Sequence, residues 1–168
     1  NQETKYFLKR LKVKKIKNIG NLKFAEHDIK TITKLDPKFK NRKIWIASST
    51  HSDEEIFCAK THIELKKKIK NLLTILIPRH VHRAKEIKSE LETLKLNAIS
   101  HSSNKKNLKN TDIYIVDTFG ETKKFHKMGC SVFIGGSIIN RGGQNPLEAA
   151  RFGAKILHGP NIDNFKDV

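Results

Sequence analysis

The sequence predicts an α/β domain built on a doubly wound parallel sheet. Strand-like and helix-like segments alternate at least five times from residue 43 onward, which is typical of this fold class. Residues 72–77 are apolar at nearly every position, as expected of a parallel strand that is buried on both faces. Most of the unusual residues fall in the loops that follow the predicted strands, and doubly wound sheets bind their ligands at that edge.

The length and the chain ends indicate one domain of a longer protein. The 168 residues suit one compact domain, and no apolar run approaches the ~20 residues of a membrane-spanning helix. The sequence lacks an initiator methionine and both ends fall inside helical patterns, so we expect a piece of a longer chain. We predict that residues 1–40 are an inter-domain approach segment and linker, and that residues 41–168 form the Rossmann-like domain.

The approach segment has weak signals. Residues 1–11 are predicted to end a helix, and the basic, β-branched stretch 12–19 is expected to form a short strand. Residues 20–24 break that pattern, and the polar residues 26–40 include Asp36 and Pro37, which signal a turn.

The Rossmann-like part begins with a strand at residues 44–47. The next helix is expected to use Thr50 or Ser52 as its N-cap, with three acidic residues at 53–55 in its first turn. Pro78 ends the apolar strand, and the helix after it carries apolar residues at helical spacing. Later strands are predicted at 97–100, 112–116, 130–134 and 155–157, later helices at 121–127, 145–152 and from 162 onward, and a polar loop at 102–110.

The formal net charge of +17 invites a nucleic-acid or membrane-surface function. However, 28 of the 34 basic residues are lysine and only 6 are arginine, the residue expected where phosphates or bases are read bidentately. Lysine, isoleucine and asparagine supply 61 residues, which indicates a compositional bias of the genome. Aromatic residues, at 7%, are too few for a base-stacking surface, so we expect no nucleic-acid partner and, if the charge is functional, an anionic membrane surface.

Cysteine and histidine patterns point away from a metal centre. Cys58 and Cys130 are far apart in the sequence and are predicted to be free, buried thiols. His80 and His82 have a spacing that suits a metal, but His82 falls in the next predicted helix. The acidic residues after His51 are better explained by helix capping. We therefore predict no metal and no cofactor.

The glycine-rich segment after the strand at 130–134 is the strongest motif. Four glycines precede a predicted helix start, where the backbone can approach a ligand and free N–H groups favour a phosphate. The segment is not a P-loop. Capping explains Asn145, Pro146 and Glu148 as N-cap, N1 and N3, but it does not explain the glycines.

Two other loops carry candidate binding residues. Arg79 follows the strand at 72–77, where its guanidinium can bind a phosphate, a carboxylate or a base edge, although a surface arginine beside a turn fits equally well. Asp117 and Thr118 follow the strand at 112–116, and either ribose binding or helix capping accounts for them. No nucleophile triad and no pair of catalytic carboxylates is apparent.

Taken together, these segments resemble the C-terminal half of the 3-deoxy-D-manno-octulosonic acid (Kdo) transferases of lipopolysaccharide synthesis. The matching residues occur in the family's order and cover residues 18–165. Small departures are Phe119 for a usual Met, Ala149 for a usual Pro and Asp53 for a usual Gly or Pro. The matching segments are Gly20-Asn21-Leu22-Lys23-Phe24, Trp45-Ile46-Ala47-Ser48-Ser49-Thr50-His51 with Glu54-Glu55, Pro78-Arg79-His80, Asp117-Thr118-Phe119-Gly120-Glu121, Gly135-Gly136-Ser137, Gly142-Gly143-Gln144-Asn145-Pro146-Leu147-Glu148, and Gly159-Pro160 with Asn164-Phe165.

The resemblance implies the donor-binding half of an inverting glycosyltransferase of the GT-B type. That enzyme transfers Kdo from CMP-Kdo to a lipid A precursor at the cytoplasmic face of the bacterial inner membrane, without a nucleotide-bound metal. The family's general base is a glutamate of the N-terminal domain, so no residue of this chain is expected to be catalytic. The acceptor is expected to bind through that other domain.

The resemblance also implies individual donor-binding roles. Arg79, with its neighbour His80, would face the cytosine side of CMP, and Glu148 would hold the ribose hydroxyls. Asn145 and the backbone of Gly142 and Gly143 would contact the phosphate and the sugar acid. Thr50, His51 and Gly120 would line the same cleft.

Two alternatives stay open. Another GT-B enzyme that uses a different sugar nucleotide would share the glycine-rich helix start, but the Pro78-Arg79-His80 segment would then be unexpected. A non-enzymatic basic module for RNA or anionic lipid would show steeply salt-dependent binding and no preference for CMP.

Overall fold

The structure, a computed structural model, describes residues 2–17, 36–105, 107–166 and 168, and the chain divides into two compact units, residues 1–32 and 33–168. The first unit contains helix α1 (Gln2–Arg10), as expected for residues 1–11. Residues 12–17 form no strand, so the strand expected at 12–19 is wrong for its described part. A strand needs a neighbour to pair with, and the described residues of this unit provide none. The predictions at 18–24 and 26–35 lie outside the described residues.

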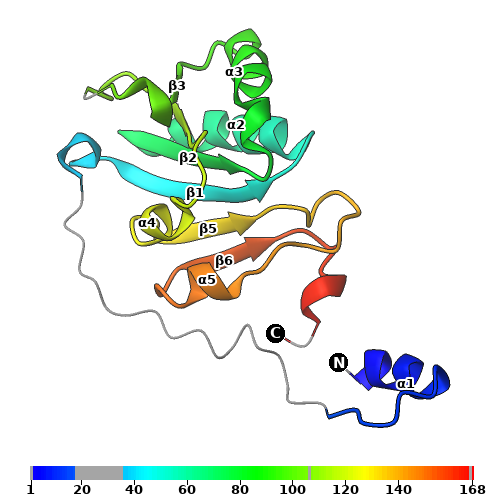
Figure 1. Cartoon of the computed structure of the whole chain (residues 1–168). Coiled ribbons are helices and arrows are strands. Elements are labelled where there is room, and N and C mark those ends of the chain that lie inside the picture. The colour runs from blue at the N-terminus through cyan, green and yellow to red at the C-terminus, as the bar shows by residue number, and fades with distance from the viewer. Residues whose placement is uncertain (1, 18–35, 106, 167) are drawn as a thin grey trace. The chain divides into compact units, whose positions relative to one another are not determined.

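The second unit is a six-stranded parallel sheet, which confirms the predicted fold class (Figure 1). The strand order is β3-β4-β2-β1-β5-β6, so β1 lies inside the sheet between β2 and β5. On the β2 side the chain first reaches the edge strand β3 and then returns to place β4 between β2 and β3. The strands are β1 (Lys43–Thr50), β2 (Leu72–Pro78), β3 (Ala98–Ser100), β4 (Ile113–Ile115), β5 (Ser131–Ile134) and β6 (Lys155–His158).

Helices cover both faces of this sheet. Residues of α2 and α3 pack in one hydrophobic cluster with one face of the strands, and residues of α4 and α5 pack in a second cluster with the other face. The helices are α2 (Glu54–Lys66), α3 (Ala84–Thr93), α4 (Thr122–His126) and α5 (Leu147–Ala150), with 3-10 turns η2 (Pro37–Phe39), η3 (Val81–Arg83), η4 (His101–Ser103) and η5 (Asp163–Phe165).

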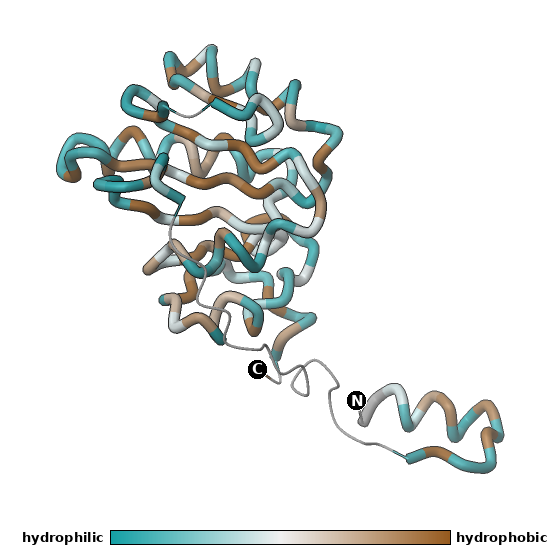
Figure 2. Tube along the Cα trace, turned by 60° about the vertical axis from the view of Figure 1, so that its left-hand side comes forward, coloured by the Kyte–Doolittle hydropathy of each residue, from teal (hydrophilic) through white to brown (hydrophobic). Residues whose placement is uncertain are grey.

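Side chains that alternate along β2 contribute to both hydrophobic clusters. Leu72 and Leu76 face the cluster of α2 and α3, whereas Leu73, Ile75 and Ile77 face the other one. Every residue of β2 is buried, which is why its apolar run shows no period of two. Figure 2 shows these hydrophobic stretches as brown segments running through the sheet. Phe39 of η2 is only 1% exposed and belongs to the second cluster, while the assignment of residues 1–40 as an approach segment stays a prediction.

Several local predictions need correction. Neither Thr50 nor Ser52 caps α2; its N-cap is Asp53, which has a positive φ of 72° and makes no side-chain capping bond. Cys58 is buried as predicted, but Cys130 is exposed because it precedes β5 at the sheet's amino edge. Helix α5 is shorter than the predicted 145–152, and the helix expected from residue 162 is a single 3-10 turn.

The amino edge of the sheet is closed by the chain's own polar groups. The guanidinium of Arg42 donates hydrogen bonds to four backbone carbonyl oxygens that come from the starts of β2 and β4. These oxygens belong to Asn71, Leu72, Leu108 and Thr111. The carbonyls of Asn71 and Leu108 also accept the backbone N–H groups of Lys43 and Thr111, so Arg42 adds a charged donor to carbonyls at the start of the sheet.

A second polar group at this edge centres on Asp112. Its carboxylate accepts from Lys66 of α2 and from the backbone N–H of Asn97, the latter at 2.9 Å. The buried ring of His62 lies 3.5 Å from the same carboxylate and 2.8 Å from the hydroxyl of Thr74. No helix in the described part of the chain has both the length and the apolar character that crossing a bilayer requires.

Candidate functional site

The carboxyl edge of the sheet holds the candidate site. Strand β1 pairs in parallel with β2 on one side and β5 on the other, so the loops after these strands meet at the point where the strand order reverses. Ligands of doubly wound sheets bind at this switch point. The backbone N–H of Arg79 donates to the carbonyl of Thr50 at 2.8 Å, and that of Gly135 donates to Ser48 at 2.8 Å, which fixes the three loop starts together.

Two arginines lie at this edge of the sheet. Arg79 follows β2 and Arg141 belongs to the loop after β5, and both side chains are exposed. Among the residues that the structure describes, neither guanidinium makes a hydrogen bond or an ion pair. Arg42 and Arg83 differ from them, because Arg42 binds carbonyls and Arg83 pairs with Glu55 and Glu86. The unpaired guanidinium groups are available to an anionic ligand.

Histidine rings lie beside these arginines. The ring centroid of His51, in the loop after β1, lies 5.7 Å from that of His80, which in turn lies 5.6 Å from His82. Burial lowers the pKa of His51, Glu54 opposes this effect, and the nearby His80, Arg141 and Arg79 lower the pKa further. The Nε2 atom of His51 is buried without a hydrogen-bond partner in the described part of the chain.

Glu54, the first residue of α2, occupies the centre of the switch point. Its side chain is fully buried, and its two carboxylate oxygens accept four backbone N–H groups. The donors are His51 at 3.0 Å, Gly136 at 2.7 Å, Ser137 at 3.1 Å and Ile138 at 3.0 Å. The carboxylate thus joins the loop after β1 to the loop after β5.

Its neighbour Glu55 is also buried but turns toward α3. One oxygen of Glu55 lies 3.1 Å from the guanidinium of Arg83, whereas the other has no hydrogen-bond partner among the described residues. Burial raises the pKa of Glu55, and the positive charge of Arg83 opposes that shift. The two adjacent acids therefore hold two different parts of the sheet edge.

The glycine-rich loop is held in a defined shape. Gly142 and Gly143 have positive φ angles of 73° and 75°, which residues with side chains rarely adopt. Asn164 encloses this turn: its side-chain amide donates to the carbonyls of Arg141 and Gly143, and its backbone N–H donates to Gly142. A Cβ atom on Gly135 would lie only 2.3 Å from the carbonyl oxygen of Ser49, so a larger residue there would push the two loops apart.

The start of α5 carries the other predicted donor-binding side chains. The side-chain oxygen of Asn145 accepts the backbone N–H of Leu147 at 3.0 Å. Helix α5 begins at Leu147 and its N-cap is Pro146, so the predicted positions of Asn145, Pro146 and Glu148 are each wrong by one residue. Glu148 is partly exposed, and its carboxylate lies 3.9 Å from Nδ1 of His126. The other ring nitrogen of His126 lies 2.9 Å from the hydroxyl of Ser48, and burial lowers the pKa of His126 from its ordinary 6.5 to about 4.

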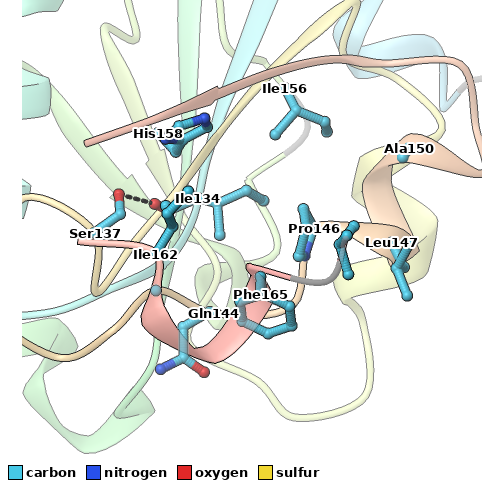
Figure 3. A pocket seen from close by; sticks show the side chains of 12 residues that line it. Ile134, Ser137, Gln144, Pro146, Leu147, Ala150, Ile156, His158, Ile162 and Phe165 are labelled. Carbon is cyan, nitrogen blue, oxygen red and sulfur yellow. Dashed lines mark hydrogen bonds between the residues drawn. The ribbon is translucent and has the colours of Figure 1, made fainter. Parts of the chain in front are cut away.

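A mostly apolar pocket of about 320 Å³ lies beside the glycine loop. Figure 3 shows Pro146 and Leu147 of the α5 start, Ile156 of β6 and Phe165 of η5 around it. It shares Gly143 with the predicted site, but Thr50, His51 and Arg79 do not line it. The pocket therefore adjoins the cationic loops without containing them.

The structure sorts the predicted site residues into groups. Thr50, His51, Arg79 and His80 come together at the ends of β1 and β2. Gly142, Gly143, Asn145 and Glu148 follow β5, and Gly135 and Gly136 connect the two groups, since Gly135 packs against Thr50 and Gly136 against the side chain of Arg141. Gly120, with a φ of 80°, lies on the exposed loop after β4, next to Phe119, which is 82% exposed.

Two residues of the site were not predicted from the sequence. Arg141 stands among the glycines without a motif of its own, and Glu54 was interpreted only as an acid in the first turn of a helix. Only the proximity of the loops after β1 and β5 reveals both roles. The described residues contain no cluster of three or more histidine, cysteine, aspartate or glutamate side chains that could hold a metal ion.

Comparison with known proteins gives consistent results. No family model matches the chain. It is 36% identical to a 3-deoxy-D-manno-octulosonic acid transferase of Rickettsia bellii over 90% of this chain and 37% of that protein. It is 33% identical to the Haemophilus influenzae protein of the same name over 92% of this chain and 37% of that protein. The chain thus spans little more than a third of the length of these relatives.

A solved structure agrees with the sequence relatives. The C-terminal CMP-Kdo binding domain of WaaA from Acinetobacter baumannii superimposes with a TM-score of 0.69 and 28% sequence identity, covering 77% of this chain and 67% of that one. Sequence and fold therefore give the same answer: the chain is a homologue of the 3-deoxy-D-manno-octulosonic acid transferases and has the fold of the C-terminal domain of WaaA.

Proposed function

We propose that this chain is the CMP-Kdo-binding half of a GT-B enzyme that transfers Kdo to a lipid A precursor in lipopolysaccharide synthesis. One observation carries the proposal: the guanidinium groups of Arg79 and Arg141 have no hydrogen-bond or ion-pair partner among the described residues, and the two residues lie at the switch point of a sheet whose fold matches that of a CMP-Kdo-binding domain. A donor with a phosphate and a sugar carboxylate supplies the anionic groups that two arginines can bind.

We assign each part of the donor to particular residues of the loops. Arg79, with His80 beside it, faces the cytosine side of CMP, and Glu148 holds the ribose hydroxyls. Asn145 and the backbone at Gly142 and Gly143 meet the phosphate and the sugar acid. Thr50, His51 and Gly120 line the same cleft. During transfer the CMP phosphate gains negative charge, and nearby N–H groups and arginines stabilise that charge.

We place the general base in another domain of the whole protein. Within this chain, the carboxylate of Glu54 is buried and accepts four N–H groups, so it is poorly placed to take a proton from an acceptor. The carboxylate of Glu121 lies 3.0 Å from the amine of Lys124. The acceptor lipid and the inner-membrane surface, on its cytoplasmic side, belong to the whole protein, and the +17 charge is compatible with an anionic surface.

A nucleotide panel tests the proposal. Isothermal calorimetry of the 168-residue chain with CMP, UMP, AMP and GMP is expected to show weak binding that prefers CMP. A preference for another nucleotide would favour a different GT-B transferase. Binding of RNA or anionic vesicles that falls steeply with salt, without a preference for CMP, would favour the basic-module alternative.

A transfer assay tests the division of labour between domains. We expect this chain alone to release no CMP from CMP-Kdo in the presence of a lipid A precursor, because closure of a second domain supplies contacts and excludes water. Robust transfer by the chain alone would contradict this account and would make Glu54, Glu121 or Glu148 the base.

A further inference from the structure

The carboxylate of Glu54 fills an anion-binding site made of backbone N–H groups. Its Oε2 atom accepts from His51 and Gly136, and its Oε1 atom accepts from Ser137 and Ile138. Successive N–H groups that converge in this way form a concave site for an anion. Here the anion is part of the protein, and it is fully buried.

The negative charge of the Glu54 carboxylate matters as much as its shape. Each oxygen takes two N–H donors, so an amide in the same position would have to turn its NH₂ group toward two of them. Replacement by glutamine would therefore leave two buried N–H groups without an acceptor, and it would also remove the negative charge that four donors stabilise.

The peptide units that bind the Glu54 carboxylate also form hydrogen bonds to the glycine-rich loop. Gly136, whose N–H binds the carboxylate, accepts the N–H of Gly143 through its carbonyl at 2.8 Å. Gly135 accepts the N–H of Gln144 at 3.0 Å, and Ser137 accepts the N–H of Asn161 at 2.9 Å. The loop that carries Arg141 and the turn at Gly142 and Gly143 is thus anchored on residues that Glu54 holds.

We propose that Glu54 is a positioning residue: its carboxylate acts as an internal anion that holds residues 136–138 and thereby fixes the glycine loop in its ligand-binding shape. The effect of Glu54 on donor binding rests on the proposed function, whereas the role of its carboxylate as an internal anion does not. Glu54 acts through the loop and does not contact the donor.

Chemical rescue tests the internal anion. Glu54→Ala keeps Cβ and removes a fragment that acetate matches, a methyl carbon and a carboxylate. We expect the variant to melt at a temperature lower by about 5 °C or more. Acetate added at constant ionic strength should raise the melting temperature of Glu54→Ala, whereas neutral acetamide should not. Glu64→Ala, with an exposed carboxylate on the same helix, should lose little stability and should not respond selectively to acetate.

Glu54→Gln provides a second test if the alanine variant does not fold. We expect it to melt below the wild type and to bind CMP at least about tenfold more weakly, since two N–H groups lose their acceptor and the loop loosens. Glu64→Gln is the control and should keep the wild-type affinity for CMP.

The outcomes separate this inference from the proposed function. Equal effects of acetate and acetamide on a folded Glu54→Ala, no rescue by acetate, or a wild-type melting temperature for Glu54→Gln would overturn the internal anion. If Glu54→Gln melts early but binds CMP like the wild type, the positioning role is wrong. If the wild type itself does not bind CMP, the proposed function fails, while the acetate series still decides whether Glu54 is an internal anion.

Discussion

The two edges of the sheet treat their charged groups in opposite ways. At the amino edge, Arg42 gives its guanidinium to backbone carbonyls, and Asp112 binds Lys66 and a backbone N–H. At the carboxyl edge, the guanidinium groups of Arg79 and Arg141 make no hydrogen bond or ion pair within the described residues. The arginine of the amino edge therefore contributes to stability, whereas Arg79 and Arg141 of the carboxyl edge keep their guanidinium groups available for a ligand.

The largest effect is expected at the amino edge. Arg42→Met keeps the apolar stem but leaves four carbonyl oxygens without their charged donor. We expect the free energy of unfolding in urea to fall by about 3–4 kcal/mol. The affinity for CMP of the folded fraction should not change. A large loss of affinity with unchanged stability would reverse the roles assigned to the two edges.

Acidification should weaken the fold through His126, which lies beneath the carboxyl edge. The folded state holds this ring neutral with a pKa of about 4, whereas the unfolded chain takes up a proton below its ordinary 6.5. The stabilisation is complete above pH 6.5 and is lost as the pH falls toward 4, by up to about 3 kcal/mol.

The control for this pH dependence is His126→Phe, which keeps a ring but cannot titrate. Its free energy of unfolding should fall less steeply than that of the wild type between pH 7 and pH 4 in urea titrations. Parallel pH profiles for the two proteins would show that His126 is not the group responsible.

A conservative change at Arg79 separates binding from stability. Lysine keeps the charge but cannot form the planar pair of hydrogen bonds that a guanidinium offers. We expect Arg79→Lys to weaken CMP binding by about 1–3 kcal/mol in calorimetry. The free energy of unfolding should stay within about 0.5 kcal/mol of the wild type, because the side chain is exposed. Unchanged affinity in a folded variant would remove Arg79 from the site.

The smallest effect distinguishes two roles of Glu148. Glutamine keeps most of a capping interaction at the start of α5 but loses the charge that pairs with ribose hydroxyls. We expect Glu148→Gln to weaken CMP binding about tenfold, or about 1.4 kcal/mol, with little change in melting temperature. A lower melting temperature with unchanged CMP affinity would limit Glu148 to a role in the helix.

The sheet could be predicted from the sequence because its signals are local. The apolar run at 72–77 and the glycine-rich helix start each show their structure within a few residues. The short helices and the exposed Cys130 were less visible, since their ends depend on packing against other elements. The strand expected at 12–19 is wrong for its described part, 12–17, because these residues have no partner strand among the described residues of their unit.

The candidate site could be predicted in its parts but not in its connections. Arg79 and the glycine loop stood out as sequence motifs, while the role of Glu54 depends on residues 82 to 84 positions away in the chain. Only the pairing of β1 with β5 brings these groups together. Arg141 had no signal of its own, because its position follows from a turn that Asn164 encloses.

The central claim is that Arg79 and Arg141, at the carboxyl edge, bind the donor nucleotide. Calorimetry with CMP on the wild type and on the double variant Arg79→Met/Arg141→Met tests it most directly, with melting curves run in parallel. We predict that the double variant binds CMP at least about 100-fold more weakly, since two charged contacts are lost, while its melting temperature stays unchanged. A folded double variant that binds CMP as tightly as the wild type would contradict the account.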